Sequence, residues 1–123
     1  MQYAILCYHD ENVITAWSKE HDDAVMEKIS AVMDRKAKQG KLGPAARLLP
    51  TTAATTLKSD REKPLVIDGP FAETKEQLLG FYIVDADSLD EALDFAREIA
   101  EVNPGGTYEV RPVGLYVPSE SAG

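Results

Sequence analysis

The residue of this chain with the clearest potential for chemistry is Asp68. The apolar segment 65–67 ends at Asp68, and Gly69 and Pro70 follow it directly. This order predicts a strand that stops in a tight turn, with one carboxylate at the strand end. A carboxylate in this place either accepts backbone N–H bonds and fixes the turn, or acts as a general base at the mouth of a pocket. The sequence leaves both roles open, and the structural role is the commoner one.

A second group of candidates lies on the later strands. Glu109 and Arg111 alternate with Tyr108 and Val110, so the two charged side chains share one face of the last predicted strand. They can pair with each other or with a neighbouring acid; otherwise the Arg111 guanidinium suits a ligand carboxylate or an enolate. Tyr82, on the preceding strand, is expected either to line the same pocket or to pack in the core. Arg111, Glu109 and Tyr82 are therefore candidate ligand-binding residues.

The two histidines are weaker candidates. His9 follows the first strand, and its imidazole could carry a proton near neutral pH, although a solvated strand-end loop explains it as well. We take His9 with Asp68 as the candidate catalytic pair. His21 lies among acidic residues that suit a helix N-terminus. No histidine spacing typical of a metal site and no phosphate-binding or dinucleotide-binding loop is present, so the sequence predicts neither a metal nor a cofactor. Cys7, between apolar neighbours, is expected to be a buried, inert thiol.

Composition limits the classes of function. The chain has 123 residues and a formal net charge of −8, without a cluster of Lys and Arg. Nucleic acid and anionic membranes are therefore not expected partners. A single cysteine excludes an intramolecular disulfide, and the N-terminus does not resemble a signal peptide. We expect a cytoplasmic protein with one domain over residues 1–117 and a small polar tail over residues 118–123.

Periodicity predicts the elements that must position these residues. Apolar residues recur three and four positions apart after Ser18 and after Ser88, which indicates two amphipathic helices. Gly40 is expected to end the first helix. Capping-box patterns start at Thr74 and at Ser88, so the first of them predicts one helical turn between Phe71 and Leu79. The predicted helices are 18–39 and the one that begins at residue 88, and the predicted strands are 2–8, 45–49, 51–58, 65–67, 80–86 and 107–113.

This order is βαβ–βαβ with an inserted hairpin, formed by segments 51–58 and 65–67. It predicts an α+β protein with a ferredoxin-like fold. The strands at 2–8 and 80–86 are apolar on both faces, yet two helices cover only one face of a four-stranded sheet. We therefore expect a symmetric homodimer in which a second copy covers the other face.

The residues also resemble a known family. Asp68-Gly69-Pro70-Phe71, with the stretch that continues to Tyr82, is similar to the central motif of the DGPF-domain proteins of the YCII-related family. The resemblance covers nearly the whole chain and implies a dimeric α+β barrel with a mostly unassigned function. It also implies a histidine in the first helix that works with an aspartate, and the spacing back from Gly40 puts that position near Ile29.

Two functions remain open. The first is a pocket for a small organic molecule with cofactor-free acid–base chemistry of a lyase or isomerase type, which the resemblance implies for related folds. Asp68 would be the base, Arg111 the anion holder and His9 a proton relay. The second is a non-enzymatic ligand sensor or interaction module, with a sigma factor as the partner that the resemblance implies.

Overall fold

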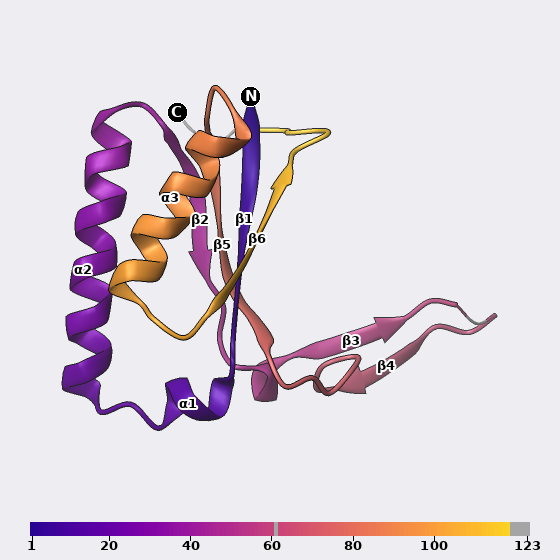
Figure 1. Cartoon of the computed structure of the whole chain (residues 1–123). Helices are drawn as coiled ribbons and strands as arrows, with labels where there is room; N and C mark the ends of the chain where they lie inside the picture. Colours follow the sequence, from indigo (N-terminus) through magenta and orange to yellow (C-terminus); the bar gives the residue numbers. More distant parts are fainter. Residues whose placement is uncertain (61, 119–123) are drawn as a thin grey trace.

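The computed structural model describes residues 1–60 and 62–118, so the predicted tail lies outside the described residues except for its first residue. Within these described residues the fold has three α-helices, one 3₁₀ helix and six strands, arranged as in Figure 1. Their order along the chain is β1 (Gln2–His9), α1 (Glu11–Thr15), α2 (Lys19–Lys38), β2 (Leu42–Arg47), the 3₁₀ helix η1 (Thr51–Ala53), β3 (Thr55–Lys58), β4 (Leu65–Asp68), β5 (Gln77–Asp85), α3 (Leu89–Val102) and β6 (Thr107–Pro112).

Four strands form an antiparallel sheet in the order β2-β5-β1-β6. β5 separates β1 from β2, and β1 separates β5 from β6, which is the split βαβ arrangement of the ferredoxin-like fold. α2 and α3 both lie on one side of this sheet (Figure 1). The predicted α+β fold with an inserted hairpin is therefore confirmed. Within the described ranges, no helix has both the length and the apolar character needed to cross a membrane.

Capping residues begin both long helices at the predicted positions, and a glycine ends the first. The Ser18 side chain accepts a hydrogen bond from the backbone N–H of His21, and the Ser88 side chain accepts one from Glu91. Each cap satisfies an N–H that the first helical turn leaves without a partner. After α2, Gly40 adopts a φ of 71°, a left-handed conformation that favours glycine and stops the helix.

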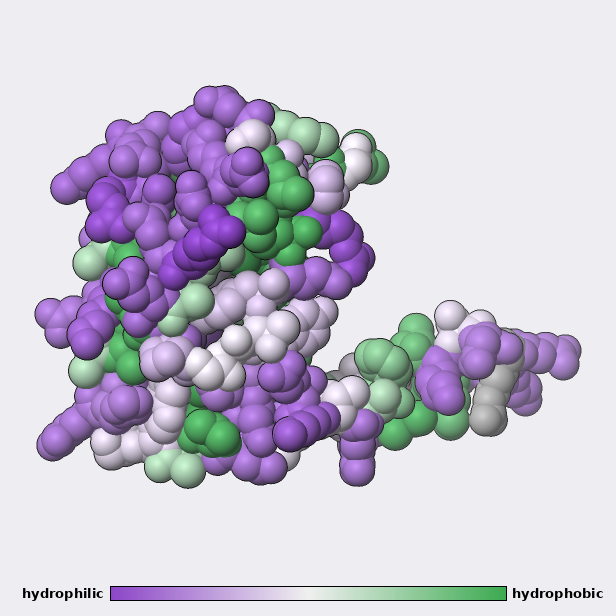
Figure 2. All heavy atoms as spheres, viewed as in Figure 1, coloured by the Kyte–Doolittle hydropathy of each residue, from purple (hydrophilic) through white to green (hydrophobic). Residues whose placement is uncertain are grey.

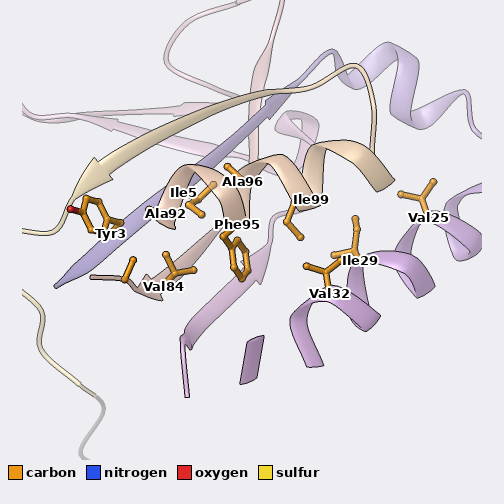
Figure 3. Close-up of a cluster of buried hydrophobic side chains, with 11 residues drawn as sticks. Tyr3, Ile5, Val25, Ile29, Val32, Val84, Ala92, Phe95, Ala96 and Ile99 are labelled. Carbon is orange, nitrogen blue, oxygen red and sulfur yellow. The ribbon is translucent and has the colours of Figure 1, made fainter. Parts of the chain in front are cut away.

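The core lies between the helices and the sheet (Figure 3). Ile5 of β1 and Ile99 of α3 are almost completely buried, at 0% and 1% exposure. Side chains of α2 and α3 point toward those of β1 and β5 in this layer. Position 29, where the resemblance puts a helix histidine, holds Ile29 at 4% exposure. The chain therefore has a core residue, and no proton-transfer group, at that position.

The other face of the sheet is covered by neither long helix. The antiparallel register aligns Leu6 with Phe81 and Ala4 with Ile83, so these half-buried apolar side chains share that face. Glu109 and Arg111 lie beside them on β6. We refer to this surface, formed by Ala4, Leu6, Tyr8, Phe81, Ile83, Glu109 and Arg111, as the open face.

The inserted hairpin forms an arm. β3 and β4 pair only with each other, and the arm projects away from the four-stranded sheet (Figure 1). Leu57 and Val66 are directly opposite one another and are 62% and 65% exposed. Figure 2 shows hydrophobic residues along the surface of this arm. The predicted hairpin is thus confirmed, while Arg61 of its loop lies outside the described residues.

Three local predictions need correction. No helical turn forms between Phe71 and Leu79; instead β5 already begins at Gln77. The Gln77 carboxamide oxygen accepts a hydrogen bond from the backbone N–H of Glu11 at 3.0 Å, so it does not cap a helix. The strand predicted over 45–49 is β2 and ends earlier, at Arg47. The segment predicted as one strand over 51–58 divides into η1 and β3.

Candidate functional site

A cavity of about 610 Å³ lies between the helix-covered side of the sheet and α2. Its floor is formed by β1, β5 and β6, one wall by α2, and its rim by α1 and the segment after β2. The lining residues that matter for its chemistry are Cys7, Tyr82 and Tyr108 on the floor, Val25, Met26 and Ile29 on the wall, and Glu11, Trp17, Lys19, Asp22 and Arg47 toward the rim.

Gly80 is one reason why this space is open. It faces Cys7 across β1 and β5 and therefore places no side chain beside the thiol. A Cβ atom at Gly80 would lie 2.5 Å from the carbonyl oxygen of Ala46, so only glycine fits between β5 and β2 without a backbone shift. The same glycine thus permits close strand packing and leaves the floor of the cavity open.

The floor offers uncharged polar groups. Burial raises the pKa of the Cys7 thiol to about 12 and that of the Tyr108 hydroxyl to about 12. Burial, and then the proximity of Cys7 and Tyr108, raises the pKa of Tyr82 well above its ordinary value. The Tyr108 hydroxyl donates to the backbone oxygen of Asn103 at 3.3 Å, whereas no described residue is a hydrogen-bond partner of the Tyr82 hydroxyl. At neutral pH this floor therefore presents hydrogen-bond donors without charge.

The charged groups at the rim are already paired. Arg47 donates to both carboxylate oxygens of Asp22, at 3.0 and 3.4 Å. The Glu11 carboxylate accepts from the backbone N–H of Thr51 at 2.6 Å and from its hydroxyl at 2.7 Å. Lys19 pairs with Asp23 at 2.8 Å. These contacts tie α1 and α2 to β2 and η1 and so hold the rim in place.

The protonation state of Cys7 gives a first testable prediction. A pKa of about 12 in place of 9.0 reduces the thiolate fraction at pH 8 from roughly one in ten to roughly one in ten thousand. Because the thiolate is the nucleophile, we expect the folded protein to react with iodoacetamide at pH 8 about a thousandfold more slowly than the same protein in denaturant. Mass spectrometry over time measures both rates, and equal rates would contradict this description of Cys7.

His9 differs from its predicted environment. It is the last residue of β1 and is 6% exposed, where a solvated loop residue was expected. Its ring packs edge-on against Trp17, with ring centroids 6.2 Å apart. It also lies against the turn at Gly105, where an added Cβ atom would be 3.2 Å from His9 Nε2. Neither ring nitrogen has a hydrogen-bond partner among the described residues. His9 is not among the residues that line the cavity, whereas Trp17 is. The exposed His21 packs against the same indole, with ring centroids 4.6 Å apart.

The other predicted site residues lie in three separate places. Asp68 is exposed at the end of β4 on the arm, and no described residue donates a hydrogen bond to its carboxylate. The turn there is held by Gly69, whose N–H donates to Ala54 and whose carbonyl accepts from Thr56. Glu109 and Arg111 pair with each other on the open face. Of the predicted residues, only Tyr82 lines the cavity.

Several lining residues were not predicted from the sequence. Glu11, Asp22 and Arg47 belong to no local sequence motif. Arg47 contacts Asp22, 25 positions away, and Glu11 contacts Thr51, 40 positions away. One signal for α1 was available, because the Asp10 side chain caps it by accepting from the backbone N–H of Asn12 at 2.9 Å. In the described part of the chain, no cluster of His, Cys, Asp and Glu is suited to holding a metal ion.

Comparisons with known proteins agree with the fold. The family model of the YCII-related domain matches residues 1–115. An uncharacterized protein of Rhizobium meliloti (strain 1021) is 61% identical over 121 residues, which cover 98% of this chain and 98% of that protein. The chain therefore belongs to the YCII-related family.

Proposed function

We propose that this protein binds a small, mostly apolar organic molecule in the cavity between α2 and the sheet. The observation that carries the proposal is an open volume of about 610 Å³ with aliphatic walls and a few hydrogen-bonding groups on its floor. Cavities of this size and character are typical of small-molecule sites.

The contacts around the cavity favour binding over acid–base chemistry. The Glu11 and Asp22 carboxylates are engaged by Thr51 and Arg47, so neither is available as a general base in this arrangement. The candidate catalytic residues Asp68 and His9 lie outside the lining. We therefore favour a ligand-sensing role over a lyase or isomerase. A sigma factor is the partner that the family resemblance suggests for such a sensor.

We further propose that a second copy of the chain covers the open face. Leu6, Phe81 and Ile83 present apolar side chains on a sheet face that neither long helix covers. Burying that face against its own equivalent gives a two-fold symmetric pair of sheets. The cavity lies between α2 and the sheet, and of the open-face residues Phe81 also lines it. Ligand binding and dimer formation can be tested separately at Met26, which lines the cavity, and at Ile83, which does not.

Filling the cavity tests the proposed function. Met26 lines the wall on α2, and Met26→Trp places an indole in the space. We expect the apolar dye phenylnaphthylamine to bind the unmodified protein with saturable fluorescence. The variant should bind it roughly thirtyfold more weakly, because about 2 kcal/mol of apolar burial is lost.

Met33→Trp is the matched control. Met33 lies two helical turns further along α2, packs against the core and does not line the cavity. This variant should retain dye binding within about threefold, provided that both variants keep cooperative thermal unfolding. Equal binding by the unmodified protein and Met26→Trp would show that the dye binds elsewhere and would refute the proposal.

A further inference from the structure

We infer that the ligand of this cavity is an uncharged molecule whose carbonyl-type oxygen accepts a hydrogen bond from the hydroxyl of Tyr82. This inference rests on the proposed function and adds the chemical class of the ligand and its orientation, with the polar end toward the sheet and the apolar body along α2.

The hydroxyl of Tyr82 is a hydrogen-bond donor on the floor of the cavity. Tyr82 lines the cavity, and no described residue is its hydrogen-bond partner. The side chain is only partly buried. Tyr108 differs, because its hydroxyl already donates to the Asn103 carbonyl. A ligand oxygen at Tyr82 would replace water at a donor that the fold leaves available.

The charges of the cavity argue for an uncharged ligand end. The floor groups Cys7, Tyr82 and Tyr108 are all neutral at pH 7, since a thiol and a phenol ordinarily lose their protons only at higher pH, and burial raises the pKa of each further. A carboxylate placed there would lack a counterion, and burying an unpaired charge is strongly unfavourable. The two cationic groups of the lining, on Arg47 and Lys19, are paired with Asp22 and Asp23. A neutral acceptor such as a ketone, an ester or a quinone oxygen fits these groups.

The position of the donor is fixed before a ligand arrives. Tyr82 packs against Phe95 of α3 with ring centroids 5.8 Å apart, and Phe95 is 3% exposed. The strand and this aromatic contact restrict the tyrosine ring, so little conformational entropy is lost when its hydroxyl is engaged. Apolar side chains of Val25, Met26 and Ile29 face the same space and suit a hydrocarbon or aromatic body.

Two uncharged dyes test the inference. Prodan has a naphthalene body and a ketone, whereas phenylnaphthylamine has a similar aromatic body and no carbonyl. Tyr82→Phe removes the donor and keeps the ring. We expect it to weaken prodan binding about 3- to 10-fold, as for the loss of one hydrogen bond, and to change phenylnaphthylamine binding less than twofold. Bound prodan should also emit at shorter wavelength in the variant, because its ketone loses a hydrogen bond.

Tyr3→Phe is the control, since Tyr3 is a buried tyrosine of β1 that does not line the cavity, and it should change the binding of both dyes less than twofold. Unchanged prodan affinity and emission in Tyr82→Phe would overturn this inference while phenylnaphthylamine binding still supports the proposed function. Tighter binding of a naphthoate than of prodan would overturn it as well, because the site would then prefer an anion. If neither dye binds the unmodified protein, the proposed function and this inference fall together.

Discussion

Replacing Ile5 by alanine is expected to lower the free energy of unfolding by about 3 kcal/mol, the central value for large-to-small substitutions in a packed core. Ile5 is 0% exposed at the centre of β1, where it contributes to the layer between the sheet and the helices. The lost methyl groups leave a void that rigid neighbours on β5 and α3 fill only in part. Urea unfolding monitored by circular dichroism measures the change, and the melting temperature should fall by roughly 10 °C.

Val66→Ala provides the comparison for this core substitution. Val66 is a similar aliphatic residue in a strand, but it is 65% exposed on the arm. Replacing Val66 by alanine should lower the free energy of unfolding by less than about 0.5 kcal/mol, as substitutions at exposed positions usually do. Similar losses for the two variants would mean that the cluster around Ile5 is not the main core of the fold.

Ile83→Asp is expected to produce the second large effect, a shift from dimer to monomer. The substitution places a carboxylate in the middle of the open face, and two-fold symmetry brings in a second one from the partner. Burying an unpaired charge makes the free energy of dimer formation less favourable by about 4 kcal/mol, which weakens the proposed dimer by about a thousandfold. Light scattering coupled to size exclusion should give twice the chain mass for the unmodified protein and one chain mass for this variant.

The arm supplies the control for this charge substitution. Val66→Asp introduces the same carboxylate at an exposed position away from the open face, and the dimer should persist. A monomeric unmodified protein at micromolar concentration, or a dimer that Ile83→Asp leaves intact, would refute the proposal that the open face is the dimer interface.

The parts of the fold that could be predicted depend on contacts within a few residues. Ser18, Gly40 and Ser88 act on their own helix ends, so the limits of α2 and the start of α3 follow from the sequence. The pattern at Thr74 is of the same kind as that at Ser88, yet no helix forms there. Its Gln77 instead receives a hydrogen bond from Glu11, 66 positions away. A long-range partner of this kind cannot be identified from the local pattern.

The candidate site was less predictable for the same reason. Tyr82 was identified because an aromatic residue with a hydroxyl suits a pocket, and it does line the cavity. For His9 the sequence leaves open a proton relay or a residue of a solvated loop, but Trp17 and the turn at Gly105 pack against its ring and the residue is buried. For Asp68 the sequence leaves open a turn-fixing carboxylate or a base at a pocket mouth, and the hairpin that carries it extends away from the sheet as an arm. The rim contact of Asp22 with Arg47 depends on how α2 packs against β2.

A methyl NMR titration of the unmodified protein with phenylnaphthylamine shows whether a ligand occupies the cavity. We expect chemical-shift changes at the methyl groups of Met26, Ile29 and Ile99, which line the cavity. Ile83 on the open face and Ile67 on the arm should keep their shifts. Changes confined to Ile83 or Ile67, with Ile29 and Ile99 unaffected, would place the ligand outside the cavity and refute the proposed binding site.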